Sequence, residues 1–113
     1  MAFSDDEQSE IKKVLDPYIS RVRPPLEIRD EVDLAYKIHD QSVEIYEIRK
    51  TFDERIVDVP IAKTTFNRTS NQWKVFWQRA DLKWHGYEPS KEVAKLKDFV
   101  KLVEEDRQGC FWG

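Results

Sequence analysis

The fold is decided by one stretch of the sequence, Val32-Asp-Leu-Ala-Tyr-Lys-Ile-His39, in which apolar and polar residues alternate. Successive side chains of a β-strand point to opposite faces, so this period of two predicts a strand with one buried face. A second run of similar character, residues 42–49, follows after only Asp40 and Gln41. A connection of two residues is typical of a β-hairpin, so the two runs predict an antiparallel pair.

The register of this hairpin follows from the length of its turn. The expected opposite pairs are Ile38 with Val43, Tyr36 with Ile45, Lys37 with Glu44, and Leu34 with Glu47. The first three pairs sort apolar and charged residues onto separate faces, whereas the fourth pair does not. That end of the hairpin is therefore expected to carry either a bulge or a second contact surface.

Three more strands are expected towards the C-terminus. One lies within residues 56–66, where Pro60 favours an edge position or a bulge because proline donates no ladder hydrogen bond. After a turn at residues 68–71, residues 72–87 form a last hairpin that is rich in aromatic residues. The connections between these strands are too short for parallel crossovers, so the whole sheet is expected to be antiparallel.

The last hairpin is expected to have one buried and one open face. With an even loop around Ala80 and Asp81, Trp77 lies opposite Trp84. The predicted core face then carries Trp73, Val75, Trp77, Leu82 and Trp84. The other face carries Lys74, Phe76, Gln78, Lys83, His85 and Tyr87. An odd loop would move one strand by a residue and redistribute these side chains between the faces.

A helix is expected before the strands. Apolar residues recur at helical spacing over residues 11–22, and Ser4 with Glu7 fits a capping box at the start of this helix. Pro17 lies inside the pattern. It implies either a kink or a break, after which Asp16 caps a second short helix.

A second helix is expected after the strands. Ser90 is the predicted N-cap, and Gly109 is the predicted stop signal. The apolar stripe of this helix consists of Val93, Leu96, Phe99, Val100 and Val103. The order of elements predicts an α+β fold: an antiparallel sheet of about five strands, including two hairpins, flanked by an N-terminal helix region and a C-terminal helix. The chain length predicts a single domain over residues 1–113.

The composition favours a soluble cytoplasmic protein. Hydrophobic residues make up 40% and charged residues 36% of the chain, and no apolar run is long enough for a membrane span. The acidic start lacks the basic and apolar regions of a signal peptide, so nothing directs export. Cys110 is the only cysteine and cannot form an intramolecular disulfide, which agrees with a reducing compartment.

Several short segments resemble one bacterial protein family. They are Arg21-Val22-Arg23-Pro24-Pro25, Ile28-Arg29-Asp30, Gln41-Ser42-Val43, Pro60-Ile61-Ala62, Val75-Phe76-Trp77, Trp84-His85-Gly86-Tyr87 and the ending from Asp106 to Gly113. From about Arg23 onward the chain resembles the family catalogued as domain of unknown function 3024. The family often has a proline and an aromatic residue where this chain has Thr51 and Phe52, so that loop is expected to differ. The resemblance implies no activity, cofactor or catalytic residue.

The open face of the last hairpin is the candidate binding surface. Its cations and rings alternate, and the candidate site residues are Lys74, Phe76, Lys83, His85 and Tyr87. Such a face could stack nucleic-acid bases on the rings while the lysines contact phosphates. The alternative is a structural face covered by the helices or by a second subunit. The net charge of −3 favours this alternative, because nucleic-acid-binding domains usually carry an excess of positive charge.

No constellation in the sequence predicts catalysis, a metal ion or a cofactor. His39, His85 and Cys110 lie in separate elements without the spacing of zinc ligands. The charged run of residues 29–33 is typical of a solvated strand entry. Only three glycines are present, so a glycine-rich phosphate loop is excluded. We therefore assign no catalytic residue, metal ligand or cofactor.

The ending Phe111-Trp112-Gly113 has two competing interpretations. The rings either dock on the core or form an exposed motif that a partner recognises. Docking is favoured, because burying each ring contributes about 2 to 3 kcal/mol.

Three functional hypotheses follow. The leading one is a non-enzymatic binding domain that contacts another protein or a second copy of this chain, because aromatic residues are abundant and no catalytic motif is present. The second is nucleic-acid binding by the last hairpin. The third is a small enzyme that uses His85 with a neighbouring carboxylate, and it requires a cleft beside His85.

Overall fold

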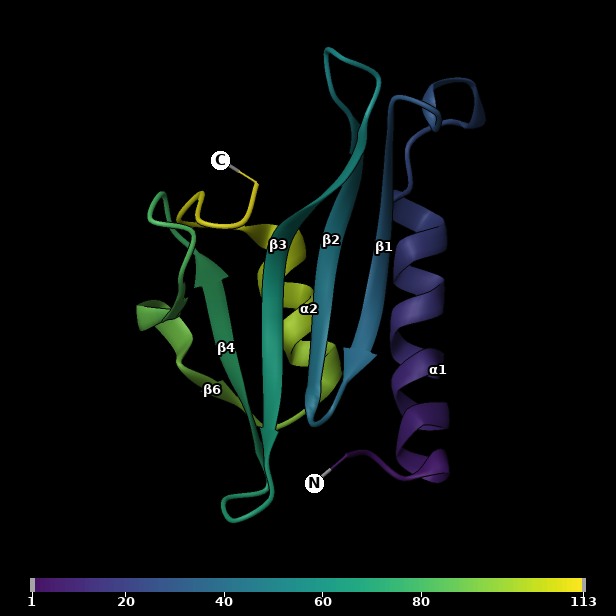
Figure 1. Cartoon of the computed structure of the whole chain (residues 1–113). Helices are drawn as coiled ribbons and strands as arrows, with labels where there is room; N and C mark the ends of the chain where they lie inside the picture. Colours follow the sequence, from purple (N-terminus) through teal and green to yellow (C-terminus); the bar gives the residue numbers. More distant parts are fainter. Residues whose placement is uncertain (1, 113) are drawn as a thin grey trace.

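The computed structural model describes residues 2–112 and confirms an α+β fold on an antiparallel sheet. In chain order its elements are α1 (Asp5–Val22), η1 (Leu26–Ile28), β1 (Val32–His39), β2 (Ser42–Lys50), β3 (Ile56–Asn67), β4 (Gln72–Gln78), β5 (Trp84–Gly86), η2 (Glu88–Ser90), β6 (Glu92–Val93) and α2 (Leu96–Glu105). The elements η1 and η2 are short 3-10 turns. In Figure 1, α2 lies behind the central strands and α1 runs alongside β1.

The sheet has the strand order β1-β2-β3-β4-β5, and β6 also pairs with β4. One edge of β4 pairs with β3. The other edge is shared, because β5 pairs near Trp77 and β6 pairs near Trp73. Both edges of β4 are therefore covered, although β5 has only three residues.

The first hairpin has the predicted register. Ile38 lies opposite Val43, Lys37 opposite Glu44, and Leu34 opposite Glu47, with no irregularity between β1 and β2. The bulge lies between β2 and β3 instead, because Ile45 pairs with Ala62 while Tyr46 pairs with Pro60 and leaves Ile61 as an extra residue. Pro60 is thus tolerated beside a bulge, as its missing N–H predicts.

The second hairpin differs from its predicted register by one residue. Trp84 lies opposite Gln78, not Trp77, and Trp77 lies opposite His85. The loop between the paired residues is therefore odd, residues 79–83, and it contains Leu82 in a left-handed conformation with φ of 63°. The Leu82 side chain, expected in the core, is 77% exposed. The even loop was the wrong alternative, and the faces of β5 are exchanged relative to the prediction.

The helices agree with the predicted stripes but differ in their limits. The Ser4–Glu7 capping box is present, and α1 continues through Pro17 without a break. The second helix begins at Leu96, so Ser90 is not its N-cap, and Val93 lies in β6. Pairing with β4 explains the late start, because β6 extends along β4 before the chain turns into α2. No helix among residues 2–112 is long and apolar enough to span a membrane.

The core lies between the two helices and one face of the sheet. The strands contribute side chains such as Val43, Ile45 and Val75, which are fully buried against one another and against the helices. The buried helix side chains are Ile11, Leu15 and Tyr18 of α1 and Leu96, Phe99, Val100 and Val103 of α2. We call the sheet face that packs on these helices the inner face.

The C-terminal ending docks on this core. Phe111 is only 5% exposed, and its ring centroid lies 5.0 Å from that of Tyr87. The carboxylate of Asp106, itself in a left-handed conformation, accepts hydrogen bonds from the N–H groups of Phe111 and Trp112 at 3.0 and 2.9 Å. The indole Nε1 of Trp112 donates to the carbonyl of Val103 at 3.0 Å. The docking hypothesis is therefore confirmed for the ring of Phe111, whereas Trp112 is held by its hydrogen bonds but stays 41% exposed, and Gly113 lies outside the described residues.

Candidate functional site

The sheet face opposite the helices is open. Residues that lie opposite each other in antiparallel strands share a face, and the registers place Lys37, Glu44, Lys63 and Phe76 in one row from β1 to β4. We call this side the outer face. Its central side chains are Lys37, Glu44, Tyr46, Lys63, Thr65, Lys74, Phe76, Gln78 and Trp84. Within residues 2–112, the buried helix residues belong to the opposite side, and no helix lies over the outer face.

Aromatic rings and lysines alternate on the outer face. The Lys63 Nζ lies 5.5 Å from the ring centroid of Phe76 and 5.4 Å from that of Trp84. The Lys37 Nζ lies 5.1 Å from the centroid of Tyr46. All three rings are half-buried. An ammonium group over a ring is attracted to its negative face, so the lysines orient and partly cover these rings.

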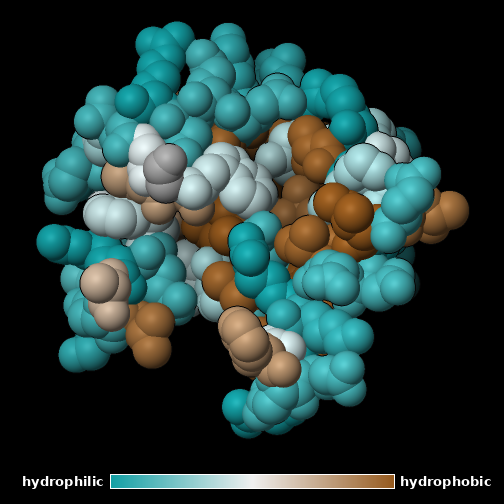
Figure 2. Space-filling view, turned by 90° about the horizontal axis from the view of Figure 1, so that it is seen from above, coloured by the Kyte–Doolittle hydropathy of each residue, from teal (hydrophilic) through white to brown (hydrophobic). Residues whose placement is uncertain are grey.

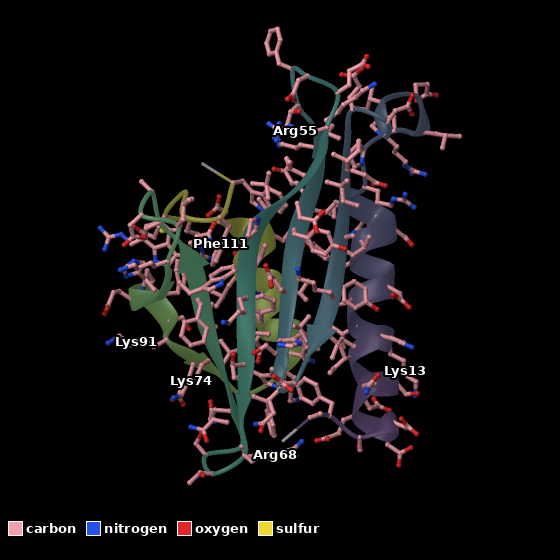
Figure 3. All side chains as sticks on the ribbon, in the orientation of Figure 1. Lys13, Arg55, Arg68, Lys74, Lys91 and Phe111 are labelled. Carbon is pink, nitrogen blue, oxygen red and sulfur yellow. The ribbon has the colours of Figure 1, made fainter. Side chains whose placement is uncertain are left out.

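The outer face carries charges of both signs. Lys37, Lys63 and Lys74 lie on it, and so do the carboxylates of Glu44, Asp58 and Glu92. Glu44 lies 4.0 Å from the Nζ of Lys37, which is a weak contact. Lys74 is exposed and projects from β4 (Figure 3). Charges of both signs therefore share the outer face, and neither sign is clearly in excess.

The structure brings only two of the five predicted site residues onto the outer face. Lys74 and Phe76 lie there as expected, and Lys83 is exposed in the loop before β5. His85 shares the inner side with Trp77, and Tyr87 is 2% exposed in the core. The placement of His85 and Tyr87 on the open face was wrong, because the odd loop exchanged the faces of β5.

Four residues that were not among the predicted site residues also lie on the outer face. They are Lys37, Tyr46, Lys63 and Trp84. Lys37 lies on the charged side of the first hairpin in the predicted register, and Tyr46 is two residues from Glu44 and so shares its side of the strand. Both could have been added to the site by following alternate positions across the sheet. Lys63 depends on the bulge in β3, and Trp84 depends on the loop of the last hairpin. Neither position has a local sequence signal.

His85 has the neighbouring carboxylate that the enzyme hypothesis requires. Its Nε2 lies 2.9 Å from Oδ2 of Asp81. A hydrogen bond from the Lys83 backbone N–H, together with this contact, lowers the pKa of the Asp81 carboxyl. These contacts join the loop of residues 79–83 to β5 and hold it in place.

Cys110 is not arranged as a nucleophile. Burial raises the pKa of its thiol, and the nearby Asp106 carboxylate raises it further. A reactive cysteine needs the opposite shift, because only the thiolate attacks or binds metal. Among the described residues, no three His, Cys, Asp or Glu side chains are grouped so that they could hold a metal ion.

Comparison with known proteins identifies a family but no described function. A family model described as "Domain of unknown function (DUF3024)" matches residues 3–113. It covers the first helix as well as the segments on which the resemblance rested. No curated protein and no solved structure matches the chain.

Proposed function

The chain belongs to the DUF3024 family, and we propose that it is a non-enzymatic binding domain that contacts another protein through the outer face of its sheet. One observation carries the proposal. Both helices pack on the inner face, while Tyr46, Phe76 and Trp84 are on the side that no helix of residues 2–112 covers.

The composition of the outer face supports a protein partner. The solvent side of an antiparallel sheet normally carries polar residues, whereas this one carries three large rings, in β2, β4 and β5. Tyrosine, tryptophan and phenylalanine are enriched in protein interfaces because they bury a large area with few rotatable bonds. Glu44 between two lysines gives the face both signs of charge, which would align a partner rather than attract any polyanion.

A site-specific crosslinker tests this surface. A photo-crosslinking amino acid at Thr65 samples the outer face, and the same group at the exposed Lys12 samples the solvent side of α1. We expect a discrete protein adduct in cells from position 65 but not from position 12. The adduct should disappear when Phe76→Thr and Trp84→Ser are added. Identical adducts from both positions, or an adduct indifferent to the two ring substitutions, would contradict the proposal.

Single-stranded nucleic acid is the second candidate. It is favoured by Lys63, whose ammonium group lies over the rings of both Phe76 and Trp84. This group could contact a phosphate while a base stacks on either ring. Fluorescence anisotropy with a labelled oligonucleotide at several salt concentrations tests it. Each lost phosphate contact should reduce the slope of log affinity against log salt by about 0.7. Binding that is absent, or unchanged in Lys63→Ala with Lys74→Ala, excludes this candidate.

The proposal also covers the cellular compartment and the extent of the folded domain. We place the interaction in the cytoplasm, consistent with a single half-buried cysteine that has no disulfide partner. Residues 1–113 are proposed to fold and bind as one domain, without a metal ion or cofactor. Limited proteolysis should then give one protected core that retains both helices.

A further inference from the structure

A groove on the inner side of the sheet lies apart from the outer face. It has a volume of about 430 Å³ and is bordered by the start of α1, the turn between β3 and β4, and the segment before α2. Its apolar wall consists of Phe3, Ile11, Val14, Phe66, Trp73 and Leu96. The volume falls in the range of small-molecule sites, about 300 to 1,000 Å³.

Three aromatic rings form the floor of this groove. The ring centroid of Trp73 lies 5.0 Å from that of Phe66 and 5.7 Å from that of Phe3. The planes are tilted by 54° and 31°, so the three rings curve around a common space instead of stacking flat. Trp73 and Phe66 are only half-buried, and the groove exposes part of their surface. Ring faces carry partial negative charge and attract cations.

Carboxylates border the same groove on the α1 side. Asp6 and Glu10 are four residues apart on one side of the helix, and both line the groove. Asp6 has no ion pair or side-chain hydrogen bond within residues 2–112. Glu10 meets only Lys13, in a pair whose two side chains are each 72% exposed and which is therefore weak. Lys95 is the single cation among the lining residues.

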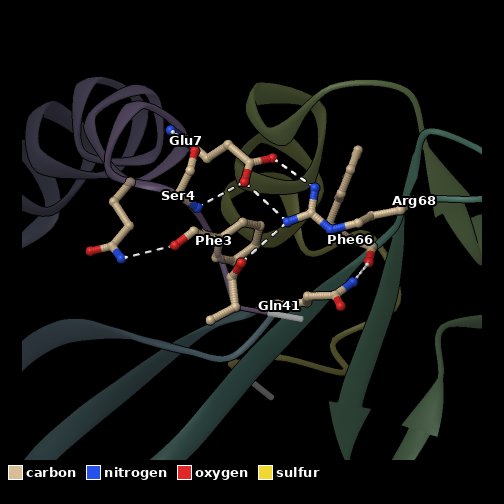
Figure 4. A network of polar contacts seen from close by, with 8 residues as sticks. Phe3, Ser4, Glu7, Gln41, Phe66 and Arg68 are labelled. Carbon is tan, nitrogen blue, oxygen red and sulfur yellow. Dashed lines mark hydrogen bonds and ion pairs between the residues drawn. The ribbon is translucent and has the colours of Figure 1, made fainter.

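A hydrogen-bond network holds the wall of the groove in place (Figure 4). Arg68 donates from Nη1 and Nη2 to the two oxygens of Glu7, each at 3.0 Å. This pairing, with the backbone N–H of Ser4, lowers the pKa of Glu7 to about 2. Phe3 is fixed on both sides, because its N–H donates to the carbonyl of Asp40 and its carbonyl accepts from Gln8. A wall fixed in advance loses little entropy when a ligand binds.

We propose that this groove binds a small organic cation, a protonated amine carried on an apolar or aromatic body. The body would occupy the space between Trp73, Phe66 and Leu96. The ammonium group would lie at the mouth beside Asp6 and Glu10, where the carboxylates and the negative ring faces attract it together. Glu7 is already neutralised by Arg68 and supports the wall without meeting the cation. This site is independent of the proposed outer-face function.

Three probes of similar size and different charge test the proposal. They are 2-phenylethylamine, 2-phenylethanol and 3-phenylpropionate, titrated into the full chain and followed by amide and indole NMR shifts. We expect the amine to move the indole signal of Trp73 and to bind about tenfold more tightly than the alcohol, with the carboxylate weakest. Equal affinities for the three probes, or no shift at Trp73 at millimolar amine, would overturn the proposal.

Matched variants separate the site from the helix that carries it. Asp6→Asn with Glu10→Gln should lower the amine affinity at least about fivefold and leave the alcohol unchanged. Asp5→Asn is the control, because Asp5 is in the same first turn but does not line the groove. All three residues are exposed, so the variants should fold normally. An equal loss in the control variant would overturn the proposal, and amine binding should persist in the outer-face variant Phe76→Thr with Trp84→Ser.

Discussion

The two faces of the sheet are built from the same strands but differ in what covers them. In β4, Val75 points to the inner face and is fully buried, whereas its neighbour Phe76 points to the outer face and is half-buried. Both residues are apolar, so composition does not distinguish the faces. The faces differ because the helices pack on the inner face and leave the outer face exposed. Stability should therefore depend on the inner face, and the proposed protein contact on the outer face.

The end of the molecule away from the N-terminus adds to this contrast. The large apolar side chains that remain exposed lie in η1, at the β2–β3 connection, in the loop before β5 and at the C-terminus. Figure 2 views the molecule from this end and shows apolar groups between polar ones instead of a closed hydrophilic surface. Phe52 at the tip of the β2–β3 connection is completely exposed, and Arg55 follows it (Figure 3). This end of the molecule therefore exposes apolar side chains that the helices do not cover.

The largest expected effect comes from removing a helix side chain from the core, which tests whether stability depends on the inner face. Phe99 of α2 is fully buried, and Phe99→Ala should lower the free energy of unfolding by about 3 to 5 kcal/mol because it loses transfer energy and leaves a cavity. Urea denaturation measures this change. Lys97→Ala on the exposed side of the same helix is the control, with an expected change below about 0.5 kcal/mol. Similar losses in both variants would contradict the assigned core.

Deletion of residues 111–113 tests whether the C-terminal residues stabilise the core on the inner face. The docked ring of Phe111 and the Trp112 hydrogen bond to Val103 should together contribute about 3 kcal/mol. The melting temperature of the shortened chain should therefore fall clearly. Trp112→Phe keeps a ring but removes the indole donor, and its effect should be about 1 kcal/mol. An unchanged melting temperature after deletion would refute docking.

Neighbouring threonine substitutions sharpen the contrast within one strand. Val75→Thr places a hydroxyl in the core and should cost about 1 to 3 kcal/mol. Phe76→Thr keeps a residue suited to a strand on the open face and should cost less than about 1 kcal/mol. Both are measured by denaturant unfolding of otherwise identical chains. If Phe76→Thr is the more costly change, the outer face is not open in solution.

Acid titration gives the smallest expected effect. It concerns the ion pair between Glu7 of α1 and Arg68, which follows β3. The pKa of Glu7 is lowered from 4.5 to about 2 in the folded chain by Arg68 and the N–H of Ser4. The unfolded chain therefore binds a proton at higher pH, so the stabilisation is present above about pH 4.5 and is lost as the pH falls towards 2.

The Glu7→Gln variant should flatten that part of the stability profile. Glu10→Gln on the exposed side of α1 serves as its comparison and should leave the profile unchanged. The carboxyl pKa of Asp33, Asp53 and Asp81 is also lowered, so acid should still destabilise the Gln variant, though less steeply. Melting temperatures measured between pH 2 and 6 provide the profile. A profile of Glu7→Gln that coincides with that of the unchanged chain contradicts the pairing with Arg68.

Local patterns predicted the first hairpin and the stripes of both helices. The turn at Asp40 and Gln41 has two residues, and a short turn leaves one register that puts Ile38 and Val43 on the same buried face. Periodicity did not predict the faces of β5, because a change of one residue in the length of the preceding loop exchanges them. The loop of residues 79–83 depends on the Asp81 contacts with His85 and Lys83 and on the left-handed Leu82, none of which has a hydrophobic period.

The sequence by itself determined the fold class, the antiparallel pairing and the apolar side of β1 near its turn, because these follow from periods of two and 3.6 residues along the chain. Only the tertiary structure decided which elements cover each face. It moved the start of α2 to Leu96, placed Tyr87 under Phe111, and set Lys63 between Phe76 and Trp84. Such contacts join residues from separate strands and depend on bulges and loop parity, so no local pattern encodes them.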